Sequence, residues 1–146
     1  MPADARPEPS LGHLLADVVR LMRRDFYARA SGLGLTPALT RLLFYVHKEP
    51  GQRQSELAQL LDVTPVTLCR MVDRLAARGF VRREPDPRDR RAVRVVEAPR
   101  ARPLLARMTR TAALTNERAQ RGLTRRERRE LLRLLGALRA NLDAGR

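Results

Sequence analysis

The sequence predicts a mainly α-helical protein with one small β-hairpin and long helices at both ends. Apolar residues recur at helical spacing along much of the 146-residue chain, which is 43% hydrophobic. One stretch, "EPDPRDRRAVRVV" (84–96), instead ends in strand-like alternation, and Pro85 and Pro87 exclude a helix there. This hairpin directly follows two helices joined by a brief turn, which is the order of elements in a winged helix-turn-helix.

The N-terminal part begins with three prolines and alternating charge in residues 1–9, which predicts a disordered tail. Ser10 is a good N-cap for a helix that we expect to reach about Ala30. After "SGLGL", Thr36 caps a second helix with Pro37 at its first position. Its predicted apolar face consists of Leu39, Leu42, Leu43 and Val46.

A compact pair of helices follows. We expect a short helix over 55–61, a tight turn over 62–64 and a second helix over 65–78, capped by Thr64 and stopped by Gly79. The predicted inward residues are Leu57, Ala58, Leu60 and Leu61 in the first helix, and Leu68, Met71, Val72 and Leu75 in the second. The outer face of the second helix is polar and carries arginine, as a DNA-reading helix requires.

The C-terminal half starts with two predicted strands, 80–84 and 91–97, joined by the turn "PDPRDR". Helices resume near Arg100, and one extends to about Gln120. Thr124 caps the last helix, with Glu127 three residues later as a capping box.

The charge of the chain points to an anionic partner. The formal net charge is +14, and Lys48 is the only lysine, so that 29 of the 30 basic residues (30 minus 1) are arginines. Arginine offers a planar five-donor fork that matches phosphate and guanine. Nucleic acid is the first partner to consider and a membrane surface the second, while an arginine-rich solvated surface is the alternative.

Other features limit location and chemistry. Cys69 is the only cysteine, the N-terminus does not resemble a signal peptide, and no window is apolar enough for a membrane span, so we expect a cytoplasmic protein. The chain lacks a glycine-rich phosphate loop and a nucleophile elbow, and His13 and His47 are too isolated for a metal site. We therefore expect no enzyme activity, no cofactor and no metal.

The terminal helices suggest a homodimer. A winged helix covers its own small core, so that the apolar faces of the first and last helices must be buried elsewhere. They pack either within one chain or against a second copy, and we favour the second copy because two-fold symmetry suits DNA-reading modules. The predicted division is a dimerisation region of 10–34 and 100–146 around a DNA-binding domain of 35–99. The predicted dimerisation residues are Leu11, Leu14, Leu15, Val18, Leu131, Leu135, Leu138 and Leu142.

The segment "QSELAQLLDVTPVTLCRMVDRLAARGFVRREPDPRDRRAVRV" (54–95) resembles the core of the MarR family of bacterial transcription regulators. The flanks "LGHLLADVVRLMRRDF" and "GLTPALTRLLFYV" look most like the SlyA-type branch. Two departures are the absence of the usual Thr or Ser cap at Arg53 and "EAPRA" (97–101) in place of the usual "LT". The resemblance implies a homodimeric repressor of transcription that binds a pseudo-palindromic operator and in many members responds to small aromatic acids.

The resemblance also implies how DNA is contacted. Helix 65–78 would enter the major groove and wing 85–91 the minor groove, with Arg91 inserted there, Asp89 pairing with Arg91 to orient it, and Arg88 and Arg90 on phosphates. Arg70 could read guanine or phosphate, or could instead bridge to the wing or to Asp73. The predicted DNA-binding residues are Arg53, Gln54, Thr64, Pro65, Val66, Thr67, Arg70, Arg74, Arg88, Asp89, Arg90 and Arg91.

Three further interpretations stay open. An effector pocket between the first, second and wing-adjacent helices, lined by Tyr27, Phe44 and Arg70, is implied by the resemblance alone. Cys69 is either an ordinary helix residue, which we favour, or a redox-active thiol. A non-specific basic protein bound to RNA or to the nucleoid would explain the charge equally well, but not the hairpin, and aromatics are only 3% of the chain.

Overall fold

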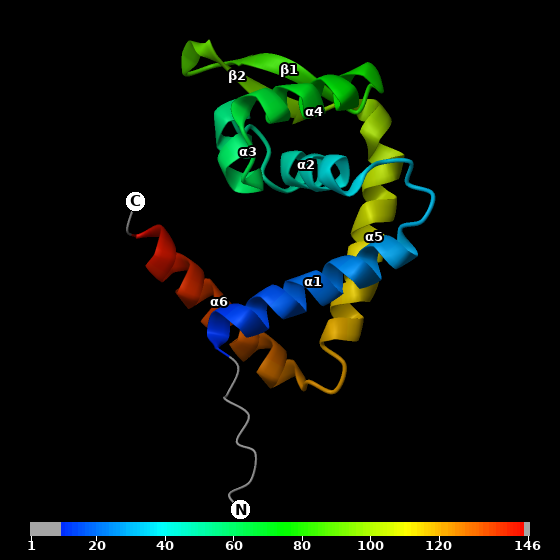
Figure 1. The fold of residues 1–146 in the computed structure, drawn as a ribbon, viewed down its shortest axis with the longest axis vertical. Coiled ribbons are helices and arrows are strands. Elements are labelled where there is room, and N and C mark those ends of the chain that lie inside the picture. Colours follow the sequence, from blue (N-terminus) through cyan, green and yellow to red (C-terminus); the bar gives the residue numbers. More distant parts are fainter. Residues whose placement is uncertain (1–9, 145–146) are drawn as a thin grey trace, which may run out of the picture.

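The computed structural model describes residues 10–144, so the tail predicted over 1–9 lies outside the described residues. The hairpin and α4 form one end of the molecule, α1 and α6 lie toward the other end, and α5 runs between them (Figure 1). The elements in chain order are α1 (Leu11–Arg29), α2 (Pro37–Lys48), α3 (Gln54–Leu61), α4 (Pro65–Ala77), β1 (Val81–Asp86), β2 (Asp89–Glu97), η1 (Pro99–Ala101), α5 (Arg102–Ala119) and α6 (Arg125–Asp143). Within this range, no helix is long and apolar enough to cross a membrane.

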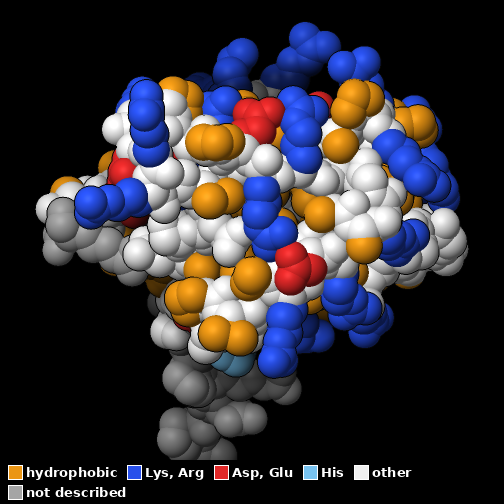
Figure 2. All heavy atoms as spheres, turned by 90° about the horizontal axis from the view of Figure 1, so that it is seen from above, with side chains coloured by type: hydrophobic (Ala, Val, Ile, Leu, Met, Phe, Trp, Pro, Cys, Tyr) orange, Lys and Arg blue, Asp and Glu red, His pale blue; other side chains and the backbone are white. Residues whose placement is uncertain are grey.

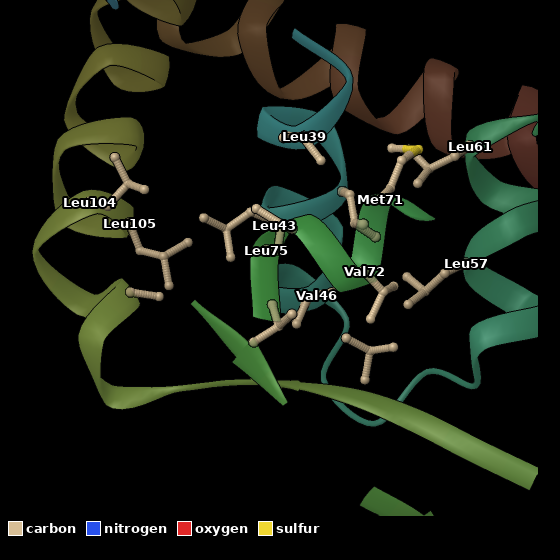
Figure 3. Close-up of a cluster of buried hydrophobic side chains, with 14 of the residues drawn as sticks. Leu39, Leu43, Val46, Leu57, Leu61, Met71, Val72, Leu75, Leu104 and Leu105 are labelled. Carbon is tan, nitrogen blue, oxygen red and sulfur yellow. The ribbon is translucent and has the colours of Figure 1, made fainter. Parts of the chain in front are cut away.

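The hydrophobic core lies between α2, α3, α4 and the first turns of α5 (Figure 3). Leu42 and Leu43 from α2 and Leu68 and Leu75 from α4 are completely buried. The predicted inward faces of α2 and α4 are therefore confirmed, and Val95 of β2 closes the core from the side of the hairpin. This core holds α4 rigidly and leaves its opposite face in solvent.

The helix starts follow the predicted caps. The hydroxyl oxygens of Ser10, Thr36, Thr64 and Thr124 each accept a hydrogen bond from a backbone N–H three residues later. At the start of α6, the Glu127 carboxylate also accepts from the Thr124 N–H at 2.7 Å, which completes the predicted capping box. Local side chains thus fix where four of the six α-helices begin.

The turn between α3 and α4 is tight because Asp62 adopts the left-handed conformation, with φ of 54°. Leu57, Ala58 and Leu61 of α3 are buried as predicted, but the prediction for Leu60 was wrong, since its side chain is 40% exposed. At about 100° per residue, Leu60 lies roughly 100° from the centre of the buried stripe. It faces solvent because α3 buries only one narrow side.

The hairpin is longer than predicted. The strands were expected at 80–84 and 91–97, yet the antiparallel pairing continues through Pro85↔Val93 to Asp86↔Asp89, with an irregularity between Pro85 and Asp86. Pro85 is tolerated because both strands of a two-stranded ribbon are edges, where a missing N–H need not break a ladder. The extra pairing narrows the tip of the wing to Pro87 and Arg88.

The segment "EAPRA" forms a bend and the short helix η1, which leads directly into α5. Beyond the core, α5 packs against α1. The Thr115 hydroxyl of α5 donates to Asp25 Oδ2 of α1 at 2.8 Å. This contact fixes α1 beside α5, while neither α1 nor α6 has a buried residue in the single chain.

Candidate nucleic-acid interface

Helix α4 presents a polar outer face with a well-ordered first turn. The Thr64 hydroxyl oxygen accepts from the Thr67 N–H at 3.2 Å, and the Thr64 hydroxyl donates to Thr67 Oγ1 at 2.9 Å. Val66 is 63% exposed, so its side chain is accessible to a partner such as a thymine methyl group. In this turn Pro65 has no N–H and the Thr67 N–H is already bonded, so the Val66 N–H and the helix dipole are what favour a negatively charged group nearby.

The arginines on the outer face of α4 are exposed. Neither Arg70 nor Arg74 forms an ion pair with any residue of 10–144, so that both guanidinium groups are free for a partner. Of the two interpretations left open for Arg70, the bridge to Asp73 or to the wing is not formed. Arg83 of β1 makes that bridge instead, with its Nη1 2.7 Å from Asp73 Oδ1.

Next to its tip, the wing is anchored by Asp86, a buried residue whose carboxylate accepts two hydrogen bonds. One comes from the Arg88 N–H at 2.8 Å and the other from Arg53 Nε at 2.6 Å. The Arg88 N–H and, after it, the Arg53 guanidinium hold the pKa of Asp86 below its usual range. The hairpin is thereby tied to the start of α3.

Arg53 therefore has a structural contact that the sequence did not suggest. Its side chain makes no cap bond, as the missing Thr or Ser implied, and the Glu56 carboxylate accepts from the Arg53 N–H at 2.6 Å instead. The neighbouring Gln54 is also engaged, since its Oε1 accepts from Arg83 Nε at 3.0 Å. Both predicted DNA-binding residues at the start of α3 are thus held by the wing in this structure.

At the tip of the wing, the predicted bond between the Asp89 and Arg91 side chains is not formed. The Asp89 carboxylate accepts from the backbone N–H of Arg91 at 3.0 Å, and no bond joins it to the Arg91 guanidinium. An aspartate bonded to the N–H two residues later shapes a turn rather than orienting the later side chain. The side chains of Arg88, Arg90 and Arg91 are exposed and make no ion pair within residues 10–144.

The outer face of α4 and the wing share one end of the molecule. Seen from that end, Figure 2 shows basic side chains over much of the surface, interrupted by few acidic ones. The free cations on these two elements are Arg70, Arg74, Arg88, Arg90 and Arg91. A helix and an adjacent basic hairpin of this kind suit the groove and backbone of duplex nucleic acid.

The predicted dimerisation residues lie on exposed apolar faces of α1 and α6. Leu11, Leu14, Leu15 and Val18 of α1 are exposed, as are Leu131 and Leu142 of α6, the last at 80%. Leu135 and Leu138 are only partly covered. Packing within one chain therefore does not bury these faces among the described residues.

A pocket of about 330 Å³ lies between α1, α2 and α5. Tyr27 and Phe44 line it, but Arg70 does not, because α4 places that side chain on the opposite side of the core. The cations at this pocket are instead Arg23 and Arg41. Burial raises the pKa of the Tyr27 phenol, and the nearby Arg23 and Arg41 guanidinium groups partly offset that rise.

Cys69 and His47 each contact a residue of the hairpin. Cys69 is half-buried on α4, with Arg83 Nη2 3.5 Å from its sulfur. His47 Nδ1 contacts Glu97 Oε2 at 2.8 Å, which joins α2 to the end of β2. Within residues 10–144, no group of three His, Cys, Asp or Glu side chains is placed to hold a metal ion.

Comparison with known proteins is consistent with this geometry. A model of the MarR family matches residues 33–92, which span α2, α3, α4 and most of the hairpin. The transcriptional regulator PA3341 has a similar structure, with 33% identity, a TM-score of 0.79, and coverage of 92% of this chain and 99% of that one. The chain belongs to the MarR family.

Two other solved structures are similar to this MarR-family protein at lower sequence identity. A MarR-family regulator from Silicibacter pomeroyi is 28% identical, with a TM-score of 0.77 and coverage of 89% of this chain and 88% of that one. The regulator SlyA is 23% identical over 93% of this chain and 96% of that one, with a TM-score of 0.76, which shows the shared fold alone. The fold is the winged-helix DNA-binding fold of transcription regulators, and members of this family are regulators rather than enzymes. The SlyA-type branch stays a prediction.

The sequence did not predict the contacts of several residues at this MarR-family site. Asp86 stands two residues before Arg88, as Asp89 stands before Arg91, and this spacing favours a side-chain turn at both. The pattern could have revealed the two turns, but not that Asp86 alone would be buried against Arg53. The sequence suggests Arg82 and Arg83 only as further contacts to the DNA backbone. No local signal shows that Arg83 bonds α3 and α4 or that Arg41 faces the pocket, because these partners lie on other elements.

Proposed function

We propose that this MarR-family protein is a homodimeric, sequence-specific regulator that binds a pseudo-palindromic operator and represses transcription by occupying it. In each protomer, α4 enters the major groove and the wing reaches the flanking minor groove. The observation that carries the proposal is the set of unpaired arginines on α4 and on the wing tip, at one end of the molecule. In this arrangement Arg70 contacts a guanine or phosphate, and Arg91 enters the minor groove.

The homodimer is supported by the apolar faces of α1 and α6. A monomer rarely leaves so many large aliphatic side chains exposed along two adjacent terminal helices. Residues 10–34 and 100–146 supply the dimer contacts in this proposal, and residues 35–99 contact DNA. Two-fold symmetry then sets the spacing of the half-sites at about one helical turn or a multiple of it.

Selection from a pool of random duplex DNA tests the proposal. The purified full chain is mixed with the pool, the bound fraction is amplified, and the cycle is repeated. We expect a pseudo-palindrome whose half-site centres lie about 10 bp or a multiple apart. Light scattering on the same sample should give the mass of two chains.

The main competing function is non-specific binding to nucleic acid, and the same experiment separates the two. A parallel selection from a random RNA pool serves as the comparison. Failure of any duplex sequence to become enriched, or equal retention of RNA, would favour the general binder and contradict the sequence-specific regulator.

A small aromatic acid is the effector that best suits the pocket between α1, α2 and α5. Tyr27 and Phe44 offer ring faces, while Arg23 and Arg41 can pair with a carboxylate. Neither arginine forms an ion pair with another residue of 10–144. A bound acid would contact helices that support both the dimer contacts and the DNA-binding domain, so it could shift the distance between the two α4 helices.

Benzoate serves as the test ligand. We expect millimolar sodium benzoate to weaken operator binding, with sodium chloride at equal ionic strength as the control, because salt alone also weakens such complexes. Arg41→Ala should abolish the specific effect, whereas Arg24→Ala, on α1 but outside this pocket, should preserve it. An identical response to benzoate and chloride, or an undiminished response in Arg41→Ala, would rule out this pocket as the effector site.

A further inference from the structure

Arg83 occupies the junction of three elements. From β1, its Nη1 lies 2.7 Å from Asp73 Oδ1 of α4, and its Nε donates to Gln54 Oε1 of α3 at 3.0 Å. Its Nη2 donates to the backbone carbonyl of Cys69 at 3.3 Å. All three nitrogens of one guanidinium group are therefore bound to groups on α3 and α4.

These bonds have no substitute elsewhere in the hairpin. Among residues 10–144, every side-chain hydrogen bond between α4 and the two strands comes from Arg83. The other side-chain contacts of the hairpin go elsewhere, since Asp86 and Asp89 reach Arg53 at the start of α3 and Glu97 reaches His47 of α2. Arg83 is thus the polar link between the wing and α4.

The neighbouring arginine of β1, Arg82, makes no such contact with α3 or α4. Arg82 points to the other side of β1 and pairs with Glu84 of the same strand, with its Nη2 2.8 Å from Glu84 Oε1. That pair connects nothing beyond the hairpin. Arg82 is also more exposed, at 56% of its side chain against 33% for Arg83.

Asp73, the ionic partner of Arg83, also affects the charge of the DNA-facing surface. Asp73 is 60% exposed and lies on α4 near Arg70 and Arg74, where an uncompensated carboxylate would repel phosphates. The Arg83 guanidinium neutralises that charge. Because each nitrogen of the same guanidinium already donates to another group of the protein, Arg83 is poorly placed to contact DNA directly.

We propose that Arg83 is a positioning residue that locks the wing at a fixed angle to α4, so that both enter their grooves together. This inference rests on the proposed function, since it concerns how the two DNA-contacting elements cooperate. Two contacts held in a fixed relation bind far better than two that must be ordered separately. Without the lock, α4 still reaches its half-site, but the wing engages less often.

The test measures dissociation constants for a duplex recovered from the selection described above. Arg83→Ala should weaken binding by about tenfold, and Asp73→Asn by about three- to tenfold. The Asp73 result is decisive, because that variant gains positive charge on the DNA-facing side and would bind more tightly if charge alone mattered. Arg83→Lys should not restore affinity, since an ammonium group cannot reproduce the fork that reaches three acceptors.

Two comparisons complete the experiment. Arg82→Ala is the matched control and should change affinity less than about twofold. In an Arg91→Ala background, Arg83→Ala should add less than about a further twofold, because a residue that acts through the wing has no effect once the wing no longer reaches DNA. Thermal unfolding of each variant monitors the fold, and if Arg83→Ala fails to fold, Asp73→Asn and Arg83→Lys decide the question.

Other results would overturn the inference. Binding by Asp73→Asn as tight as that of the wild type, together with rescue by Arg83→Lys, would make Arg83 a simple phosphate contact. Fully multiplicative effects of Arg83→Ala and Arg91→Ala would do the same. If the wild type selects no sequence at all, the proposed function itself fails, whereas selective wild-type binding that Asp73→Asn leaves unchanged removes only the positioning role.

Discussion

The arginines of this protein differ in what their guanidinium groups already bind. Arg53 and Arg83 are committed to carboxylates of the protein, whereas Arg70 and Arg91 have no ionic partner within residues 10–144. A free guanidinium keeps its donors for phosphate or for a base edge, and a paired one must first break an internal contact. The paired arginines therefore hold elements of the protein together, and the unpaired ones are those that we expect to contact DNA.

The first prediction concerns Arg91. Arg91→Ala should weaken binding to the selected operator by about tenfold or more, because an arginine in a narrow minor groove meets a strongly negative potential. The variant should remain dimeric, since the wing tip is remote from α1 and α6. A gel-shift titration measures the affinity, and light scattering measures the mass. An affinity equal to that of the wild type would contradict the minor-groove role.

At the scale of elements, the wing is a hairpin anchored at several points along its length, while the arginine side chains at its tip stay free. Arg83 holds the hairpin against α3 and α4, Asp86 and Asp89 beside the tip pair with Arg53, and Asp89 also shapes the turn. A ribbon of two strands is marginal on its own, so these anchors give it a defined direction. The wing can then present positive charge at a fixed distance from α4.

Neutralising the wing gives the second prediction. Log affinity falls as log salt rises, so this slope is negative. The triple variant Arg88→Ala, Arg90→Ala and Arg91→Ala should make the slope shallower by about 0.9 for each phosphate that the wing no longer neutralises. The effect follows from the release of fewer counterions. Anisotropy titrations at several salt concentrations measure the slope, with Arg82→Ala as the control that keeps it. An unchanged slope in the triple variant would exclude phosphate contacts by the wing.

The third prediction concerns the contact of Asp25 on α1 with Thr115 and Arg118 on α5, which we call the clasp. The Asp25 carboxylate accepts from Arg29 at 2.8 Å, from the Thr115 hydroxyl and from Arg118, and these bonds, that of Arg29 foremost, hold its pKa well below the usual range. A lowered pKa in the folded state stabilises the fold above the unfolded value of about 4, and this contribution is lost as the pH falls below it. Asp25→Asn should therefore be less stable than the wild type at pH 7.

Urea unfolding at a series of pH values measures this difference. The gap between wild type and Asp25→Asn should narrow steadily as the pH falls below about 4, since protonation removes the same charge from the wild type. Asp62→Asn is a suitable control, because no hydrogen bond or ion pair of residues 10–144 involves that carboxylate. A gap that stays constant from pH 7 to strongly acid conditions would show that the clasp does not depend on the charge of Asp25.

The whole molecule combines a well-packed winged helix with terminal helices whose leucine faces stay exposed in the described part of one chain. The core between α2, α3, α4 and the first turns of α5 buries the inward faces of the DNA-binding helices. The leucines of α1 and α6 remain in solvent, which is costly for a lone chain and supports the proposed homodimer. The shape in Figure 1, with α6 extending away from the rest, suits a partner that packs around it.

The fourth prediction follows from that surface. Leu131→Glu should shift the protein toward monomers in light scattering and weaken operator binding, since each half-site would then be bound alone. Leu60→Glu is the matched control, because its leucine is exposed to the same degree, 40% against 41%, but lies on α3. If both variants keep the same mass and affinity as the wild type, α6 does not form the dimer contact.

Local patterns predicted much of this fold, and the exceptions are instructive. The caps at Ser10, Thr36, Thr64 and Thr124 act over three residues, so they can be read directly from the chain. Leu60 was assigned wrongly because a helix of eight residues buries a narrower face than its apolar content suggests. The hairpin was drawn too short because proline normally interrupts a strand, yet the ribbon has only edges.

The candidate site was predicted less completely. The composition and the wing pattern led to the free arginines at the tip, which are local features. The expected bond from Asp89 to the Arg91 side chain was wrong, and Arg70 was considered for a bridge that Arg83 makes. Among arginines of equal chemistry, the sequence does not indicate which one meets a carboxylate on another element.

By itself, the sequence determined the order of the elements, the helix caps, the inward faces of α2 and α4 and the strong positive charge, because all of these depend on neighbours within a few residues. The tertiary structure alone decided that Asp86 anchors the wing on Arg53, that Arg83 joins the wing to α4, and that Arg41 rather than Arg70 faces the pocket. Such contacts join residues 10 or more positions apart. Their formation depends on how the packed core sets the distances between elements, which no local pattern encodes.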